Sequence, residues 1–182
     1  RLSLGVEHRQ RNLLDGAVRN SRRAGNEGRV YPDQRQVAPD GHAGIDQEAL
    51  DIGNVTKEQI MQYPPMGEIY GQLISILSKY VDKYNKKDKF HLVGYNINAF
   101  DNAFFRAFFV QNYDNYFGSW FWADSIDVYV LASNKFKKER SNFENFQQRT
   151  VAKYLGIEVD EQRLHDAEYD ISLCIEIYNK VS

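Results

Sequence analysis

Apolar residues recur at intervals of three and four between residues 66 and 84, and this period predicts an amphipathic helix. Its apolar face comprises Ile69, Leu73, Ile76, Leu77 and Tyr80. The pair Pro64-Pro65 breaks the chain just before this helix, because proline fixes φ and lacks a backbone donor. Two shorter helices are predicted upstream, over residues 45–50 and 55–60, and Thr56 is a suitable cap for the second.

The pattern changes after a polar turn at residues 85–88. Residues 90–95 form a mostly apolar run, which predicts a buried strand. The helical period returns over residues 100–112, where phenylalanines occupy one face: Phe100, Phe104, Phe105, Phe108 and Phe109. A stripe of this kind is more typical of a core than of a ligand site.

The remaining chain is predicted to be mainly helical. Its segments are a short extended piece at 119–124, a helix at 126–132, a lysine-rich loop at 135–140, a helix at 150–155 ended by Gly156, and a last helix at 166–181. The inward face of the last helix is assigned to Ile171, Cys174, Ile175 and Tyr178. This order of elements indicates an α/β fold. The pattern predicts only one strand with certainty, so we expect the strands that pair with it to lie upstream.

Composition divides the chain at about residue 42. Residues 1–42 contain eight arginines, no lysine and one aromatic residue, whereas residues 43–182 contain eleven lysines, four arginines and 24 aromatic residues. The first segment has no helical or strand period and little apolar surface to bury. It has three interpretations: a basic arm that contacts phosphates, a disordered tail, or sequence not native to the domain.

A frameshifted or mispredicted start explains this segment best. When the codons of residues 30–36 are shifted by one nucleotide, they permit Phe, Ile, Leu, Ile, Asn, Val and Lys, which is a strand-like run. We therefore predict residues 1–42 to be anomalous and residues 43–182 to form the domain.

Bulk properties restrict the class of protein. The formal net charge of −2 gives no general attraction for nucleic acid, so any such binding requires a local patch. The single cysteine, Cys174, excludes an internal disulfide and fits a reducing compartment. Neither a membrane span nor a signal peptide is predicted, and the expected location is the cytoplasm.

Three side chains are candidates for chemistry: Asp101, His165 and Asp170. Asp101 follows a buried strand and its loop, where open α/β sheets place their sites, although an acid there also suits the helix dipole. His165 and Asp170 lie about one turn apart at the start of the last helix. A carboxylate there can bind a divalent cation while the imidazole takes a proton from water, but such a pair also arises by chance.

Two segments resemble motifs of the DnaQ-like, DEDDh superfamily of 3′→5′ exonucleases. Gly94-Tyr95-Asn96-Ile97-Asn98-Ala99-Phe100-Asp101 is similar to the second motif, and His165-Asp166-Ala167-Glu168-Tyr169-Asp170 is similar to the third. Residues 46–56 also resemble polymerase III epsilon-like exonucleases, and the likeness spans residues 44–182. It implies a ribonuclease H-like fold with a mixed sheet flanked by helices, whose amino-terminal strands are missing or disrupted here.

The resemblance also implies the chemistry of the site. Two Mg²⁺ or Mn²⁺ ions held by four carboxylates would hydrolyse phosphodiester bonds at the 3′ end of single-stranded DNA or RNA. Asp101 and Asp170 would be metal ligands and His165 the general base, while Asn96 and Asn98 are candidates for substrate binding. A DNA polymerase is a possible partner of such a domain.

The first motif of the family, Asp-x-Glu on a strand, has no counterpart in the chain. Asp46-Gln47-Glu48 matches the Asp-x-Glu pattern but lies in a segment predicted to be helical. The chain as given is therefore expected to be inactive. The alternatives are a non-catalytic nucleic-acid-binding module, in which Tyr113, Tyr116, Trp120 and Trp122 would stack on bases, and a plain structural or interaction domain.

Overall fold

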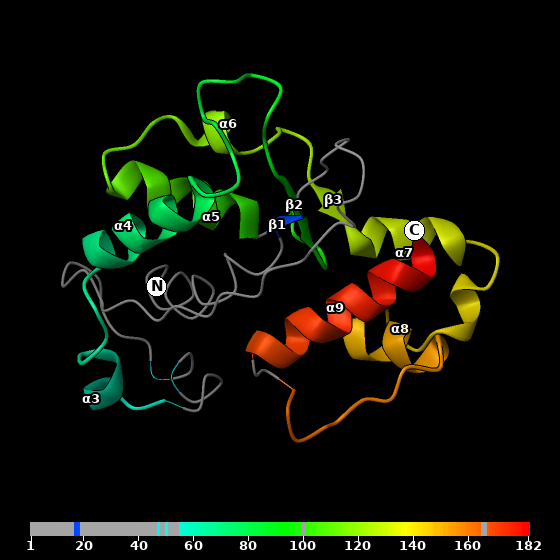
Figure 1. Ribbon diagram of the computed structural model, residues 1–182. Coiled ribbons are helices and arrows are strands. Elements are labelled where there is room, and N and C mark those ends of the chain that lie inside the picture. Colours follow the sequence, from blue (N-terminus) through cyan, green and yellow to red (C-terminus); the bar gives the residue numbers. More distant parts are fainter. Residues whose placement is uncertain (1–16, 19–46, 48–49, 51–54, 100, 165–166) are drawn as a thin grey trace.

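The fold is known from a computed structural model, which describes residues 17–18, 47, 50, 55–99, 101–164 and 167–182 (Figure 1). In chain order its elements are β1 (Ala17–Val18), α3 (Lys57–Ile60), α4 (Met66–Leu77), β2 (His91–Gly94), α5 (Asp101–Gln111), α6 (Phe117–Trp120), β3 (Ile126–Asp127), α7 (Val128–Lys135), a 3₁₀ turn (Arg140–Asn142), α8 (Gln148–Tyr154) and α9 (Ala167–Val181). Helices dominate this mixed α/β chain.

The sheet is small, and β2 is its central strand. β1 pairs with β2 in antiparallel orientation, with Ala17 opposite Leu92. β3 pairs with β2 in parallel orientation, with Gly94 opposite Asp127, and a parallel bridge from Phe90 to Phe121 extends this contact. A partner strand for β2 therefore does come from the upstream segment, as expected. β3 is a second partner, and it lies downstream of β2.

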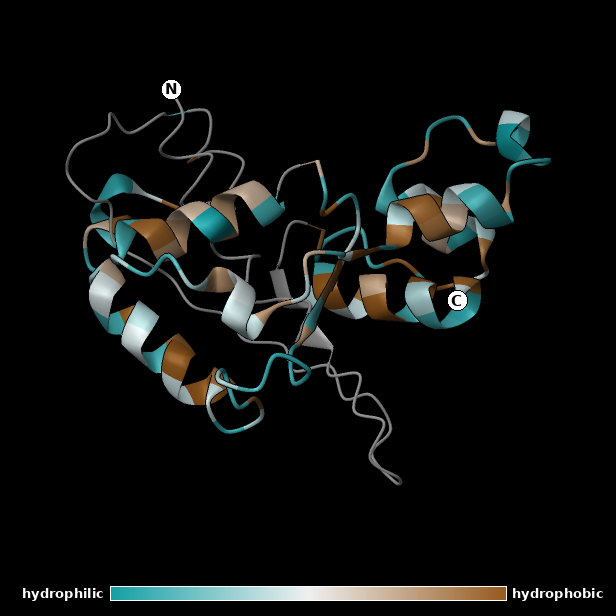
Figure 2. Cartoon of the chain, turned by 90° about the horizontal axis from the view of Figure 1, so that it is seen from above, coloured by the Kyte–Doolittle hydropathy of each residue, from teal (hydrophilic) through white to brown (hydrophobic). Residues whose placement is uncertain are grey.

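Two hydrophobic cores lie on opposite sides of β2, because successive side chains of a strand point to opposite faces. Leu92 belongs to the core formed with α4, α5 and α6, whereas Val93 belongs to the core formed with α7, α8 and α9. Figure 1 shows the two groups of helices on either side of the strands, and the view from above shows the same division (Figure 2). The sheet is thus covered on both faces.

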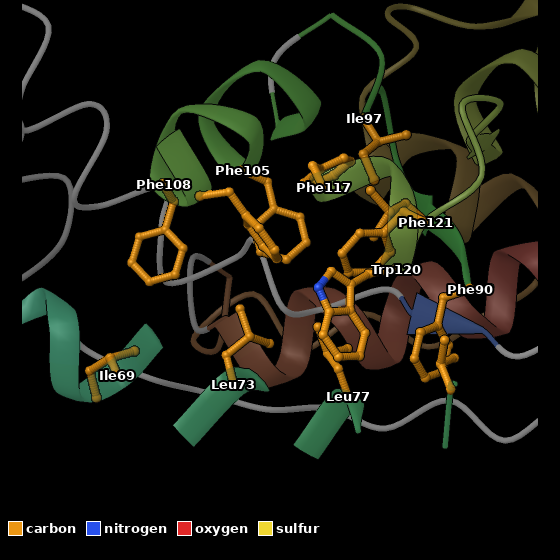
Figure 3. Close-up of a cluster of buried hydrophobic side chains, with 13 residues drawn as sticks. Ile69, Leu73, Leu77, Phe90, Ile97, Phe105, Phe108, Phe117, Trp120 and Phe121 are labelled. Atoms are coloured by element: carbon orange, nitrogen blue, oxygen red, sulfur yellow. The ribbon is translucent and has the colours of Figure 1, made fainter. Parts of the chain in front are cut away.

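The first core is unusually aromatic. Phe105, Phe109, Phe117 and Phe121 pack ring against ring, mostly edge to face, at centroid distances between 4.7 and 6.1 Å. Figure 3 shows Phe105, Phe117 and Phe121 gathering with Trp120 above the leucines of α4. Edge-to-face geometry places the positive ring edge against the negative face of its neighbour. Of the predicted phenylalanine stripe, Phe105, Phe108 and Phe109 are buried in this core and Phe104 is partly buried against it, while Phe100 lies outside the described residues.

The helix predicted over residues 66–84 ends at Leu77, so its predicted end was wrong. After Leu77 the backbone tightens, because Lys79 N–H bonds to Ile76 O and Tyr80 N–H bonds to Leu77 O. This tightening brings Val81 into the core, where it is 4% exposed. On the predicted apolar face Ile69, Leu73 and Leu77 are buried, while Ile76 and Tyr80 are only half-buried.

The segment predicted as a helix over residues 126–132 begins instead as a strand. Ile126 and Asp127 form β3, and α7 starts at Val128 and continues to Lys135. The strand has two residues, too few for a sequence period to show. The extended piece predicted at 119–124 is also only partly correct, because Ser119 and Trp120 belong to α6.

Other predicted boundaries agree with the structure. Thr56 caps α3 in a reciprocal capping box with Gln59, whose side chain accepts from Thr56 N–H at 2.7 Å. Gly156, at φ 69°, ends the helix that precedes it. α9 buries Leu173 and Ile177 in addition to the predicted Ile171 and Cys174, while Ile175 and Tyr178 are half-buried.

Two predictions concern residues that are not described. The predicted helix at 45–50 is described only at Gln47 and Leu50, which are both helical, and residues 30–36 lie outside the described residues. In the part of the chain that the structure describes, no helix has the length and apolar character needed to cross a membrane.

We expect Phe109→Ala to destabilise the fold by about 3–5 kcal/mol, because its fully buried ring contacts aromatic neighbours on several elements. Tyr113→Ala is the matched control, since that ring is 97% exposed and lies one turn away. Urea unfolding measures both changes. Equal costs for the two variants would contradict the assignment of the core.

Candidate functional site

The loop of the second motif lies where two parallel strands end. Gly94 is the last residue of β2, and it stands opposite Asp127, the last residue of β3. The chain then turns through residues 95–99 to enter α5 at Asp101. The carboxyl ends of adjacent parallel strands are the usual place for a site in an open α/β sheet.

Asp127 holds this loop in place, and it is the one buried charged residue of the described chain, at 6% exposure. Its Oδ1 accepts from Asn96 N–H at 2.9 Å and from Tyr129 N–H at 3.0 Å. Its Oδ2 accepts from Asn98 N–H at 3.2 Å. The same carboxylate therefore caps α7 and fixes the loop after β2.

The residue types in this loop have local physical explanations. A Cβ on Gly94 would lie 3.0 Å from two side-chain atoms of Ile97, so glycine allows Ile97 to fold back over the strand end. Ile97 is thereby buried at 7% exposure. Asn96 has φ 62°, a left-handed conformation that asparagine adopts more readily than most residues.

Tyr95 connects this loop to the second core. Its hydroxyl donates to Phe146 O at 2.7 Å. Burial raises the pKa of this phenol well above its usual range, and the nearby Tyr129 and Cys174 add to the effect, so the hydroxyl remains a donor. Cys174 lies on α9, one turn after Asp170 and on the same face. Tyr95 therefore packs against the buried cluster that contains Cys174 of α9.

A polar network leads from the loop toward the surface. Asn102 on α5 donates from Nδ2 to Asn98 Oδ1 at 2.9 Å and to Ser125 Oγ at 2.8 Å. Asn102 Oδ1 is buried and accepts no hydrogen bond from the described residues. The Asn98 side chain is exposed, while Asn96 is half-buried. Of the two predicted substrate contacts, Asn98 is therefore the accessible one.

The predicted ligands occupy two separate helices. Asp101 is the first residue of α5, and Asp170 lies near the start of α9; both are half-buried and both have interaction partners. The backbone of Asp170 accepts from Gln148 Nε2 at 2.5 Å, which ties α9 to α8. His165 lies outside the described residues.

The chain on either side of His165 is well anchored. Tyr169 hydroxyl accepts from Asp160 N–H at 2.6 Å, and the Arg163 guanidinium lies 5.0 Å from the centre of the Tyr169 ring. Arg163 N–H also bonds to Asp160 O at 3.2 Å. These contacts join Asp160 and Arg163 to Tyr169 of the third motif.

The sequence-based reasoning missed Asp127, Asn102 and Ser125. Asp127 carries a recognisable signal, because an aspartate directly before a helical run is a favoured amino-terminal cap. The helix was predicted to begin at residue 126, which placed Asp127 inside it instead of at its cap. Asn102 and Ser125 have no comparable signal, since they meet only through the tertiary fold.

The described residues do not complete a metal centre. Among them, no group of three or more histidine, cysteine, aspartate or glutamate side chains is placed to hold an ion. Two carboxylates are an incomplete ligand set for the pair of ions that the family resemblance implies.

Replacing Asp127 tests its role in the loop. We expect Asp127→Ala to cost about 3 kcal/mol or more, because three backbone donors lose a charged acceptor. Asp127→Asn should cost less, since one acceptor oxygen remains. Asp124→Ala is the control, as that side chain is 81% exposed. Chemical unfolding checks the order, and a cost for Asp127→Ala no larger than that of the control would contradict the assignment.

In comparisons with known proteins, no family model and no curated protein matches the chain. The geometry that stands is a loop at the carboxyl ends of β2 and β3, fixed by Asp127 and joined to α9 through Tyr95. Such a loop can present Asn98 and Asp101 together at one edge of the sheet.

Proposed function

We propose that the chain is a 3′→5′ exonuclease domain of the DEDDh type with a ribonuclease H-like fold, acting on a single-stranded nucleic-acid end. The observation that supports the proposal is that two segments distant in sequence pack against the same buried cluster. The loop before Asp101 and the helix that bears Asp170 share one buried cluster, through Tyr95 and Cys174. The loop also lies at the carboxyl ends of parallel strands.

The proposal gives each residue a separate task. Asp101 and Asp170 would contribute carboxylates to Mg²⁺ or Mn²⁺, and His165 would accept the proton of the attacking water. When bound, the ions would supply the nucleophilic hydroxide and neutralise charge on the phosphate. Asn98, held by Asn102, would orient the terminal nucleotide. Asp127 acts only through the loop that it fixes.

The absent first motif predicts that the chain as given is inactive. Asp46-Gln47-Glu48 remains an unsuitable substitute, because Gln47 between its two acids is helical and exposed. A strand carrying Asp-x-Glu is expected instead from another reading frame of the gene through residues 1–45. The competing function is a nucleic-acid-binding module without catalysis, which would not need metal at Asp101 or Asp170.

Incubation of the purified chain with 5′-labelled single-stranded DNA and Mn²⁺ should leave the DNA intact, because two of four carboxylates are missing. Restoring an upstream Asp-x-Glu strand from the frame-corrected gene should produce 3′ shortening that Asp170→Ala abolishes. Denaturing electrophoresis measures the length of the labelled DNA in both experiments. Activity of the unmodified chain that depends on Asp170 would refute the predicted inactivity. No activity in the restored chain would refute the proposed function.

A direct test of the site measures metal binding and does not require catalytic activity. In the chain with the restored upstream Asp-x-Glu strand, added Mn²⁺ should broaden amide NMR signals next to both Asp101 and Asp170, because both carboxylates would contribute to one metal site. Asp101→Asn should remove the broadening at both places, whereas the exposed control Asp124→Asn should leave it unchanged. Broadening centred elsewhere, or unaffected by Asp101→Asn, would contradict a shared metal site.

A further inference from the structure

Residues 82–89 form a basic loop at the opposite end of β2 from the candidate site. The loop connects α4 to β2, and Val81 and Phe90, both deeply buried, anchor its two ends. It carries four lysines and one tyrosine among eight residues. Figure 1 shows the loop beside α6. We call residues 82–89 the lysine loop.

The two aspartates of the lysine loop are engaged with its own backbone. Asp82 Oδ1 accepts from Tyr84 N–H at 3.0 Å, and Asp88 Oδ2 accepts from Asp82 N–H at 3.0 Å. Asn85 adds a third local bond, because its Oδ1 accepts from Lys87 N–H at 3.0 Å. These bonds shape the loop without using any lysine ammonium group.

Three of the four lysines and the tyrosine are exposed. Lys83, Lys86 and Lys87 are exposed, and within the described part of the chain none of them forms a salt bridge. The Tyr84 ring is 84% exposed. Lys83 Nζ lies 5.4 Å from the centre of that ring. A flat ring and several cations are thus presented together.

A second aromatic residue extends the same surface. Lys89 Nζ lies 5.2 Å from the centre of the Trp122 ring and donates to Gly118 O at 2.5 Å. Trp122 in turn stacks on His91 at 6.0 Å between ring centres. The basic loop is therefore held against an aromatic pair, and it does not stand alone in solvent.

We propose that the lysine loop binds single-stranded nucleic acid, as a contact separate from the carboxylate site. Lys86 and Lys87 would pair with phosphates, and Tyr84 would stack on a base. Cations combined with an exposed ring fit a strand whose bases are unpaired, because phosphates and base faces are then both available. The chain has a net charge of −2, so attraction to a polyanion has to come from a local patch of this kind. The choice of nucleic acid over another polyanion rests on the proposed function.

Fluorescence anisotropy of a labelled oligothymidylate of about fifteen nucleotides tests the proposal, with EDTA present so that no metal site contributes. Lys86→Glu/Lys87→Glu should weaken binding at least ten-fold and lower the salt slope of log K by about 1.4, which is two phosphate contacts on a single strand. Lys137→Glu/Lys138→Glu makes the same charge change at exposed lysines elsewhere and should weaken binding far less.

The ring is tested separately from the charge. Tyr84→Ala should weaken binding about ten-fold, whereas the matched control Tyr84→Phe, which keeps the ring, should retain it. These surface changes should leave the unfolding midpoint unchanged. The proposal is overturned if the wild type does not bind, if the control lysine pair is equally important, or if polyglutamate competes as well as DNA. If Mn²⁺ does not broaden the NMR signals next to Asp101 but DNA binding is intact, only the metal site is refuted.

Discussion

The carboxylate of Asp127 is the contact on which the arrangement of the site depends. A buried charge is tolerated only when its lone pairs are engaged, and here three backbone donors engage them. Two of these donors belong to the loop after β2, and the third belongs to the first turn of α7. One side chain thus joins the ends of two parallel strands to the start of a helix, and it fixes the direction from which α5 begins.

The two cores explain why this junction lies where it does. Leu92 and Val93 point to opposite faces of β2, so each group of helices packs on its own side of the strand. The chain passes from the first group of helices to the second through β3, which connects α6 to α7. Tyr95 follows β2, and its side chain packs in the second core near α9. A site at the carboxyl ends of β2 and β3 therefore includes residues from both layers.

The sequence predicted the features that local physics determines. The spacing of the phenylalanines located α5, the proline pair located the start of α4, and Gly156 located the end of α8. Features determined by distant partners were missed. β3 has two residues and exists because β2 lies beside it, so no period marks it. The end of α4 depends on burial of Val81, and the role of Asp127 depends on a loop some thirty residues earlier in the chain.

Most of the motif that suggests the function is also explained by the structure of the turn. Gly94, Asn96 and Ile97 are each accounted for by the turn: a close approach, a left-handed backbone and a buried anchor. The turn uses only the backbone N–H of residue 98, which any residue except proline would supply. The exposed amide of Asn98 is therefore not required by the turn, and Asn102 fixes its orientation. A polar side chain that the turn does not need, held in place beside the start of α5, is the part of the motif that folding alone leaves unexplained.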